Sequence, residues 1–366
     1  MADDQAPMEL DTPWRRDLTE VGPALERWAR SQIAPDARVS AASSPGNGMS
    51  SETVLFEMTI AGTEARYAAR LAPMADVYPV FPEYDIELQA KCMQLVRART
   101  DVPAPEVTWL ELHPQWLGTQ FLVMKRIDGE APPDIPPYVF GGWVADATPQ
   151  QRAAMQRRTL EVLAKLHDVN PANADLSFLV RVQHGTTALE QQLGHERWYY
   201  DWAREGVSYP LIDATFDWLD AHWPAEGPTV LNWGDARVGN VLYREFAPVA
   251  VLDWEMATLG PREVDLAWMI FLHRFFDDMA ERFGLAGIPD FLARDSVIAE
   301  YEQLTGHTVR DLEWFEVFAA LRFAIVSVRT STRGIAYGQM EEPADRDDLI
   351  MFRNLLEQML DGSYWS

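Results

Sequence analysis

Asp235, Asn240 and Asp253 are the residues whose types and spacing are best suited to chemistry. Asn240 and Asp253 are placed symmetrically about a turn at 245–247, between two short apolar runs that predict an antiparallel hairpin. Opposite residues of such a pair lie roughly 4.5–5.5 Å apart. An amide oxygen and a carboxylate held that close can share one Mg²⁺, which prefers oxygen ligands. Asp235, on the neighbouring loop, is then placed to accept the proton of an attacking hydroxyl group.

This combination of groups predicts phosphoryl transfer. That reaction needs mainly positioning and neutralisation of charge, so a base, two metal ligands and a cradle for phosphates are sufficient. Other chemistry has no such support, because the sequence lacks a His-Glu-x-x-His zinc motif and a Gly-x-Ser-x-Gly nucleophile elbow. We interpret His167 as an ordinary helix histidine.

The elements around these residues predict an α+β fold, with a small β-rich N-terminal half and a larger, mainly helical half. A stretch rich in proline and glycine, 129–142, is expected to be the loop that connects them. From about residue 150 the pattern is helical, except for a hairpin within 229–255. In the N-terminal half the periodicity predicts helices over 17–33 and 83–99 and strands over 54–60, 67–71 and 119–127.

The run Trp233-Gly234-Asp235 through Asn240, followed by Asp253, resembles the His-Gly-Asp…Asn…Asp signature of the aminoglycoside phosphotransferase-like family. That family includes choline and homoserine kinases and the kinase modules fused to some acyl-CoA dehydrogenases. The resemblance extends over about residues 40 to 330. Three further segments carry it, which look like the hinge strand, the first large C-lobe helix and the segment after the metal-binding Asp: 119–129, 163–167 and 259–267.

The resemblance implies a protein-kinase-like fold of two lobes, 1–127 and 128–366, with a nucleotide between them. It implies that Asp235 is the general base, that Asn240 and Asp253 bind Mg²⁺, and that ATP or GTP is the phosphate donor. It further implies a loop over the phosphates at 46–53 and a hinge backbone that meets the nucleobase. The residues assigned to these nucleotide contacts are Ser50, Ser51, Met124, Lys125 and Arg126.

Three positions depart from the family pattern. Arg70 stands where the family has its phosphate-binding Lys, and an Arg grips phosphate with a planar fork rather than a point charge. Gln89 occupies the position of the Glu that pairs with this Lys, with Glu87 as the alternative. Trp233 replaces the His before Gly-Asp, and we expect it to brace the loop by packing.

Further residues are candidates for orienting the loop or contacting the acceptor. Asp265 is expected to orient the catalytic loop by hydrogen bonding, whereas Arg237 either stabilises the loop or contacts phosphate or acceptor. Aromatic residues and one Arg in the helical half either wall an acceptor pocket with apolar bulk or belong to the core; they are Trp198, Tyr199, Tyr200, Trp202, Trp254, Trp268 and Arg329. A polycationic acceptor would need carboxylates instead, which Asp277, Asp278 and Glu281 either supply or merely place on a helix surface.

The composition of the protein limits which binding partners and which cellular locations are expected. The formal charge of −25 disfavours nucleic acid, whose backbone requires a basic footprint. No apolar run is long enough to span a membrane, and the acidic N-terminus does not read as a signal peptide. With Cys92 as the single cysteine, a cytoplasmic location is expected. The sequence does not indicate an oligomeric state.

Three functions remain open at this level. The first is a Mg²⁺-dependent kinase of a small hydroxyl-bearing molecule, such as an antibiotic, a hydroxyacyl-CoA or another alcohol. The second is a nucleotide-binding pseudokinase with a regulatory or interaction role, which the departures at Arg70, Gln89 and Trp233 suggest. The third, a protein kinase, is disfavoured because no activation segment ending in Ala-Pro-Glu follows Asp253.

Overall fold

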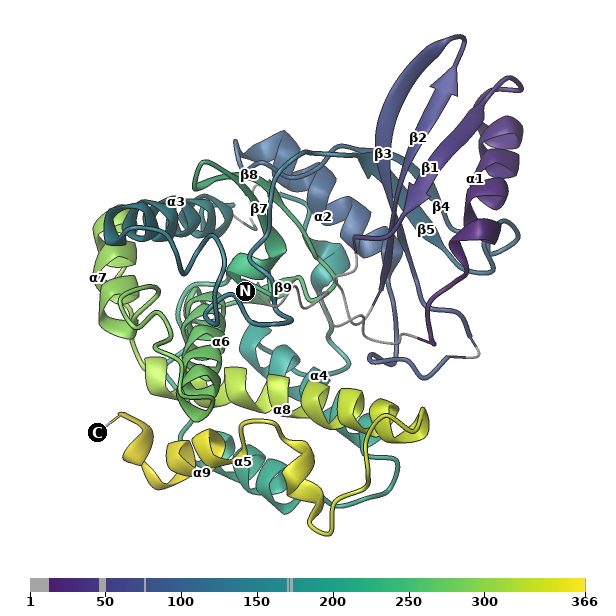
Figure 1. Cartoon of the computed structure of the whole chain (residues 1–366). Helices are drawn as coiled ribbons and strands as arrows, with labels where there is room; N and C mark the ends of the chain where they lie inside the picture. Colours follow the sequence, from purple (N-terminus) through teal and green to yellow (C-terminus); the bar gives the residue numbers. More distant parts are fainter. Residues whose placement is uncertain (1–12, 46–50, 76, 170, 172–173, 366) are drawn as a thin grey trace, which may run out of the picture.

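The computed structural model describes residues 13–45, 51–75, 77–169, 171 and 174–365, and Figure 1 shows them arranged as two lobes. The smaller lobe contains an antiparallel five-stranded sheet in the order β1-β2-β3-β5-β4. Its strands are β1 (Arg38–Ser43), β2 (Glu52–Ile60), β3 (Thr63–Leu71), β4 (Val107–Glu111) and β5 (Phe121–Lys125). The small β-rich lobe of the α+β fold predicted from the sequence is thereby confirmed.

Each face of this sheet packs against one helix. Asp17 caps the first turn of α1 (Leu18–Gln32), whose buried face, including Leu25 and Trp28, joins a core with the side chains of β2. On the other face, α2 (Ile86–Arg99) begins after its cap Asp85 and packs into the larger core of the second lobe. The sheet therefore has two buried faces, one within its own lobe and one at the junction of the lobes (Figure 1).

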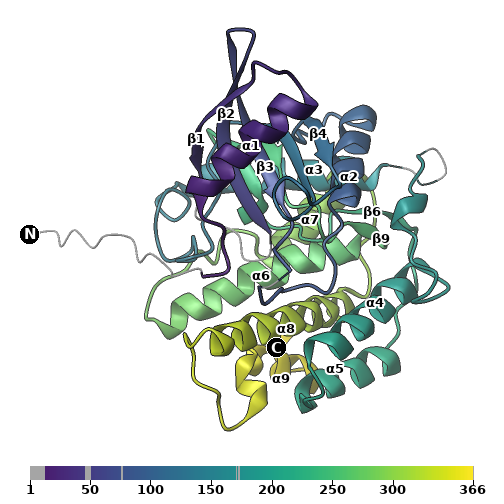
Figure 2. The same cartoon turned by 90° about the vertical axis from the view of Figure 1, so that its right-hand side faces the viewer.

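The larger lobe is mainly helical (Figure 2). Two short antiparallel pairs, β6 with β9 and β7 with β8, lie among its helices, and the loops that join these strands contain the predicted catalytic residues. The α-helices are α3 (Pro149–His167), α4 (Ala188–Ala203), α5 (Pro210–Ala221), α6 (Glu263–Arg282), α7 (Arg294–Thr305), α8 (Leu312–Ala336) and α9 (Arg353–Asp361), and the strands are β6 (Val230–Asn232), β7 (Val241–Arg244), β8 (Ala247–Val251) and β9 (Thr258–Gly260).

Most predicted elements are present, with shifted ends. The predicted helix over 83–99 starts three residues late because Asp85 accepts a hydrogen bond from Leu88 N and so caps the first turn. The predicted strand over 119–127 is shorter and matches β5 (Phe121–Lys125). Strands β1 and β4 were not predicted. The lobe boundary at 127/128 stays a prediction; β5 ends at Lys125 and α3 begins at Pro149.

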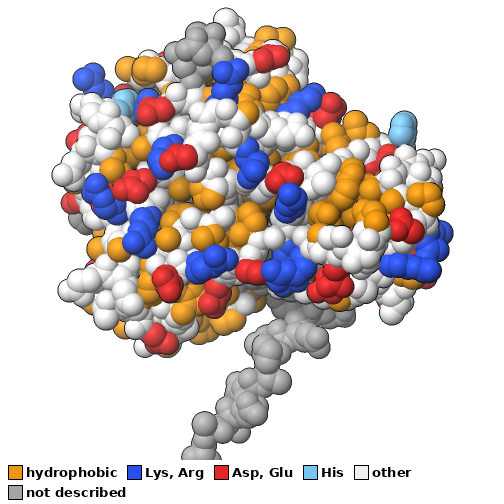
Figure 3. Space-filling model, turned by 90° about the horizontal axis from the view of Figure 1, so that it is seen from above, with side chains coloured by type: hydrophobic (Ala, Val, Ile, Leu, Met, Phe, Trp, Pro, Cys, Tyr) orange, Lys and Arg blue, Asp and Glu red, His pale blue; other side chains and the backbone are white. Residues whose placement is uncertain are grey.

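None of the helices in the described parts of the chain combines the length and apolar character needed to cross a membrane. On the face of the molecule in Figure 3, basic side chains alternate with acidic ones.

Candidate active site

The loop that carries Asp235, residues 233–240, is called the catalytic loop below; it follows β6 directly. Asp265, in the first turn of α6, is fully buried and accepts hydrogen bonds from the backbone N–H groups of Trp233 (2.8 Å) and Gly234 (2.9 Å). Gly234 has a φ of +90°, and a Cβ at this position would collide with the backbone of Met256. The loop therefore requires glycine here, and its backbone is anchored on α6.

Asp265 is also bonded to the side chain of His167. His167, at the end of α3, contacts Asp265 through Nε2 at 3.1 Å, and its Nδ1 lies 2.7 Å from the hydroxyl of Tyr301. Both His167 and Tyr301 are buried. His167 thus links α3, α6 and α7 and fixes the orientation of the carboxylate that holds the loop.

Asp235 is surrounded by hydrogen-bond donors. Its Oδ2 accepts from Asn240 Nδ2 at 2.6 Å, and its Oδ1 accepts from Trp268 Nε1 at 2.7 Å. Arg237 Nε lies 3.0 and 3.1 Å from the two oxygens. Three side chains therefore orient this carboxylate before any acceptor arrives.

Arg237 is shared between two carboxylates, because its Nη1 also pairs with Asp134. Burial by itself would lower the pKa of Arg237, but the charges of Asp134 and Asp235 raise it above its ordinary value. Of the two sequence interpretations of Arg237, the observed contacts correspond to a cation that stabilises the loop.

The ring of Trp268 packs against the guanidinium group of an arginine. The guanidinium of Arg322, from α8, lies 4.5 Å from the centre of the Trp268 ring and donates from Nη2 to the carbonyl of Gly234 at 3.1 Å. Arg322 is 3 % exposed and lies 3.6 Å from Glu196 of α4. This stack connects the helical core directly to the carboxylate of Asp235.

The hairpin register differs from the sequence prediction by one residue. Val241 pairs with Val251, and Leu252 N donates to Asn240 O, so Asn240 lies opposite Leu252 and not opposite Asp253. The prediction of opposite positions is therefore wrong. The cause is a bulge beyond Leu242, combined with a turn of two residues, Glu245 and Phe246, that both have positive φ.

Asp253 still returns toward the site after this shift. It has a φ of +59°, and the chain turns there directly after β8. Trp233 Nε1 donates to the carbonyl of Leu252 at 2.9 Å, so the catalytic loop is bonded to the residue just before Asp253. Trp233 is fully buried, and it braces the loop by this hydrogen bond as well as by packing.

The donor set fits a hard divalent cation. Both hydrogen bonds of the Asn240 amide nitrogen go to Asp235, and Asn240 Oδ1 makes no hydrogen bond with any residue in the described ranges. Asp253 Oδ2 is likewise unbonded within those ranges, since Arg70 bonds Oδ1. An amide oxygen and a carboxylate oxygen are ligands that Mg²⁺ takes. A cluster of three or more His, Cys, Asp or Glu side chains able to hold a metal does not occur among the described residues.

From the small lobe, Arg70 of β3 reaches across to the larger lobe. Its Nη2 lies 2.6 Å from Asp253 Oδ1 and 3.4 Å from Glu255 Oε2. Burial would lower the pKa of Arg70, but these two carboxylates raise it above its ordinary value. Ser51 donates to the same Glu255 oxygen at 3.0 Å. Arg70, Asp253, Glu255 and Ser51 therefore form one interlobe cluster.

Gln89 does not take part in this cluster. It is 2 % exposed on the inner face of α2, and its Nε2 is buried without a hydrogen-bond partner in the described structure. No hydrogen bond joins Gln89 to Arg70, both of which are described. Glu87, the alternative partner, pairs with Lys91 at the surface.

The hinge residues are placed at the end of β5, but two of their N–H groups are engaged. Lys125 N donates to Glu106 O, and Arg126 N donates to Arg66 O. The side chain of Lys125 pairs with Glu106. Met124 pairs with Ala68 and Val107 within the sheet. A nucleobase at this strand must therefore use carbonyl oxygens or the chain beyond Arg126. Ser50 lies outside the described residues.

The aromatic residues considered for an acceptor wall divide into two groups. Trp254 is 1 % exposed and donates to Val251 O, and Trp268 donates to Asp235, so both belong to the framework of the catalytic loop. The rest pack within the helical lobe, and within the described ranges no hydrogen bond or ring contact joins them to the catalytic loop: Trp198, Tyr199, Tyr200, Trp202 and Arg329. The structure therefore does not support these five residues as the lining of a pocket for the acceptor.

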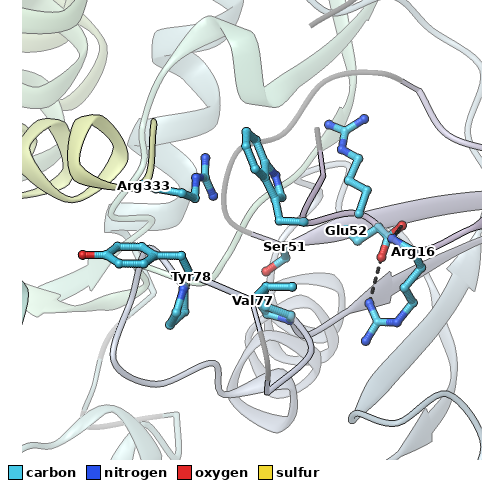
Figure 4. Close-up of a pocket in the computed structure, with 10 residues that line it drawn as sticks. Arg16, Ser51, Glu52, Val77, Tyr78 and Arg333 are labelled. Atoms are coloured by element: carbon cyan, nitrogen blue, oxygen red, sulfur yellow. Dashed lines mark hydrogen bonds and ion pairs between the residues drawn. The ribbon is translucent and has the colours of Figure 1, made fainter. Parts of the chain in front are cut away.

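A pocket lies beyond Ser51, between the N-terminal segment, the segment 73–79 and α8. Figure 4 shows Ser51, Tyr78 and Arg333 around it, while Arg16 turns back to Glu52. Arg329, one turn before Arg333, holds the same segment by donating to Tyr78 and to Pro79 O. This pocket therefore flanks the interlobe cluster at its Ser51 end.

Several residues of the site were missed in the sequence analysis. Glu255 was given no role there, yet it binds both Arg70 and Ser51. Asp134 was seen only as part of a loop, and Arg322 was not considered. The position of Glu255, two residues after Asp253, is a local signal that could have been used. Asp134 lies 103 residues from Arg237, and Arg322 lies 88 residues from Gly234 and more than 50 from Trp268, so no local pattern reports these contacts.

Comparison with known proteins bears directly on this geometry. A family model described as "Phosphotransferase enzyme family" matches residues 43–305, which is more than half of the chain and contains the whole catalytic loop. The chain belongs to this family. The resemblance inferred from Asp235, Asn240 and Asp253 is thereby confirmed at the level of the family.

Curated relatives are distant. The "Probable acyl-CoA dehydrogenase IBR3" of Arabidopsis thaliana is 26 % identical over 304 residues, covering 78 % of this chain and 35 % of the plant protein. The human "Acyl-CoA dehydrogenase family member 11" is 26 % identical over 204 residues, covering 55 % of this chain and 24 % of that protein. The chain thus spans only about a third and a quarter of these relatives.

Solved structures show the same fold over nearly the whole chain. A protein from Ralstonia eutropha assigned to the aminoglycoside phosphotransferases has a TM-score of 0.65 and 22 % identity, covering 94 % of this chain and 98 % of that one. A mutant of aminoglycoside phosphotransferase APH(4)-Ia, in a ternary complex with ADP and hygromycin B, has a TM-score of 0.57 and 14 % identity, covering 92 % and 98 %. Likenesses this distant in sequence establish the fold alone.

Proposed function

We propose that this protein transfers the γ-phosphate of a Mg²⁺-bound nucleoside triphosphate to a hydroxyl group of a small molecule. The observation that carries the proposal is the environment of Asp235. Its carboxylate is oriented by Asn240, Arg237 and Trp268, on a loop that is anchored by Asp265. Membership of a phosphotransferase family supports it.

In this proposal Asp235 accepts the proton of the acceptor hydroxyl as its oxygen attacks the phosphate. Its carboxylate has donors on both oxygens, so the incoming hydroxyl has to replace one of them. Arg237 is the donor best able to yield, because its Nη1 stays bonded to Asp134 when its Nε leaves Asp235. Asn240 and Trp268 would continue to hold the carboxylate in place.

Asn240 and Asp253 are proposed to hold Mg²⁺, which supplies charge neutralisation at the phosphate oxygens when bound. Arg70 is proposed to grip the phosphates, as its position on β3 implies. To do so it has to exchange Asp253 and Glu255 for phosphate oxygens, and this exchange also frees the second oxygen of Asp253. Ser51 and the loop before it are proposed to lie over the phosphates.

The identity of the phosphate donor and that of the acceptor are two further parts of the proposal. Structural neighbours are complexes with ADP and with GDP, so both ATP and GTP are tested as donors. The acceptor is proposed to be a small alcohol, of which antibiotics and hydroxyacyl thioesters are two classes. With a single cysteine, Cys92, which is buried, we propose that the protein acts in the cytoplasm.

The test is release of nucleoside diphosphate in the presence of Mg²⁺, ATP or GTP and a panel of hydroxyl-bearing acceptors. Asp235→Ala should lower acceptor-dependent release by roughly 10²- to 10⁴-fold while Mg·nucleotide binding persists. The control is Asp217→Ala, which removes an exposed carboxylate of α5 and should change nothing. Equal turnover of the two variants would remove Asp235 as the base.

A pseudokinase is the second candidate, and the specific observation that favours it is the Arg70–Asp253 ion pair, which occupies a proposed phosphate contact and a proposed metal ligand together. Nucleotide binding that persists when Mg²⁺ is chelated, with no release on any acceptor, would support that function. Asp253→Ala separates the two, because a kinase variant should lose the Mg²⁺-dependent increase in thermal stability on nucleotide binding, whereas a pseudokinase variant should keep its response.

A further inference from the structure

A compact pocket lies beside the catalytic loop. The loop contributes Val238 and Gly239, and α6 contributes one face that includes Met269 and Phe276. The remaining lining residues are Asp134, Tyr138, Arg237, Leu272, His273 and Leu292. On the same helix, Trp268 donates to Asp235, so one element both positions the base and lines the pocket.

Most polar groups of this lining bond to protein groups, whereas Oδ1 of Asp134 is buried without a hydrogen-bond partner in the described structure. Tyr138 Oη lies 2.6 Å from His273 Nδ1, while His273 Nε2 faces the carbonyl of Ile288 at 3.2 Å and Asp277 at 3.3 Å. Asp134 and Arg237 pair at the rim. Since these groups bond to each other, the pocket presents mainly carbon surface to a ligand.

Apolar residues continue beyond the pocket along α6 and along the connecting loop, 129–142. Phe283, which caps the C-terminal end of α6, follows Phe276 by seven residues and so lies near the same side of the helix, about 10 Å further along. Its ring lies 5.6 Å from Phe140 of the connecting loop, yet the residue is 71 % exposed. Ile135, beside Asp134, is 53 % exposed. The apolar side chains on this face of α6 and at its end are Met269, Leu272, Phe276 and Phe283. Together with Tyr138 and Phe140 of the connecting loop, they are called the acceptor wall below.

The carboxylates near this wall are already engaged. Asp277 accepts from Ile288 N and pairs with His273; burial would raise its pKa, but these contacts lower it. Asp278 pairs with Arg282. Glu281 is exposed on α6 as a single carboxylate, and Asp134 is neutralised by Arg237. The wall therefore lacks the carboxylate cluster that a polycationic acceptor needs.

We infer that the acceptor is an uncharged alcohol with an apolar carbon chain, which lies along the acceptor wall with its hydroxyl at Asp235. This inference rests on the proposed function, because it assumes that the acceptor approaches Asp235. Arg237 stands between that carboxylate and the pocket. Its withdrawal toward Asp134 lets the reacting hydroxyl reach the base, while the adjoining carbons contact the mouth of the pocket and the rest of the carbon chain runs along the outer part of the wall.

The experiment uses propane-, hexane- and decane-1,2-diol as a series of increasing chain length, with hygromycin B as the polycationic comparison. Binding is measured by calorimetry in the presence of Mg²⁺ and a non-hydrolysable nucleotide, and transfer by nucleoside diphosphate release. Affinity and kcat/KM should rise roughly fourfold for each methylene that leaves water for the wall. They should also exceed the values for hygromycin B.

Two pairs of variants test where the carbon chain of the diol binds. Met269→Gln puts an amide into the pocket, whereas the control Met359→Gln buries the same amide in α9, away from the site. Only Met269→Gln should flatten the chain-length dependence, even if both lower stability. Phe283→Glu changes an exposed residue and should weaken the decanediol about tenfold without affecting the propanediol. Its control, Val182→Glu, alters a residue that is 74 % exposed elsewhere and should affect neither.

The outcomes separate the inference from the function. Chain-length-dependent binding without transfer would keep the acceptor wall and refute the phosphotransferase. Transfer without chain-length dependence, or tighter binding of hygromycin B than of any diol, would refute the acceptor wall and keep the phosphotransferase. Absence of diol binding, or equal effects of Phe283→Glu and Val182→Glu, would also overturn the inference.

Discussion

The catalytic loop and the interlobe cluster are held in different ways. The catalytic loop is bonded within the larger lobe, where Asp265 holds its backbone and Trp268 and Asn240 hold Asp235. The interlobe cluster instead consists of Arg70 from the small lobe and two carboxylates from the large one. On α2, the buried amide nitrogen of Gln89 has no partner in the described structure.

This difference separates two tasks. A base must be oriented before the reaction, and the bonds around Asp235 connect it to α6, α8 and the hairpin. A cation that binds phosphate has to release one set of partners and take another. Arg70 pairs with its two carboxylates across the lobes, and it can exchange them for phosphate oxygens without breaking a bond of the catalytic loop. We therefore expect changes in the catalytic loop to affect stability and rate, and changes in the cluster to affect nucleotide binding.

The largest effect is expected from Asp265→Ala. It leaves the N–H groups of Trp233 and Gly234 buried without an acceptor, at about 1–3 kcal/mol each, so the free energy of unfolding should fall by about 2–6 kcal/mol. Chemical denaturation measures this. Asp278→Ala, on the same helix, breaks a surface pair with Arg282 and should cost less than about 1 kcal/mol. Similar losses for the two variants would mean that the catalytic loop is not anchored by α6.

Arg70→Ala should act on binding. Loss of this buried cation should weaken Mg·nucleotide affinity by about 2–5 kcal/mol, because phosphate oxygens lose a charge-assisted partner. Calorimetric titration with nucleotide checks the change. Arg66→Ala is the matched control, since Arg66 lies on the same strand but pairs with Asp128 at the surface. If both variants bind nucleotide like the native protein, another cation holds the phosphates.

Trp268→Phe should lower kcat and leave nucleotide affinity unchanged. The phenyl ring keeps most of the packing on Arg322 but removes one hydrogen bond to the charged Asp235, worth about 1.5–3 kcal/mol. Steady-state kinetics with an active acceptor measure the change. Trp314→Phe also removes a buried indole hydrogen bond, to Leu219 O, and should leave kcat alone. A rise in KM without a fall in kcat would assign Trp268 to acceptor binding instead.

The smallest effect is expected from Gln89→Leu. Replacing an amide whose nitrogen has no partner should raise the free energy of unfolding by up to about 1 kcal/mol, with nucleotide affinity unaltered. Thermal denaturation with and without nucleotide measures both. Gln156→Leu removes satisfied bonds to Ser296 and Leu292 N and should destabilise the protein. A loss of nucleotide affinity in Gln89→Leu would show that Gln89 supports Arg70 once nucleotide binds.

Much of the fold follows from local patterns. Alternation of Val54, Phe56 and Met58 predicted β2, because one face of a strand packs on a core while the other does not. Helix caps at Asp17 and Asp85 bound the first two helices. Strands β1 and β4 were missed, since β1 is mostly exposed and both are short. Outer strands of a sheet show little of the alternation that identifies inner ones.

The candidate site divides in the same way. The sequence by itself determined that Asp235, Asn240 and Asp253 are near one another, because they flank a single hairpin, and that Asp265 follows within reach. The tertiary structure alone decided the register of Asn240 against Leu252, through a bulge that leaves no periodic signal. It also decided that Trp268 binds Asp235 and that Glu255 binds Arg70. Such contacts depend on how α6 and the two lobes pack, and that packing is a sum over many distant side chains.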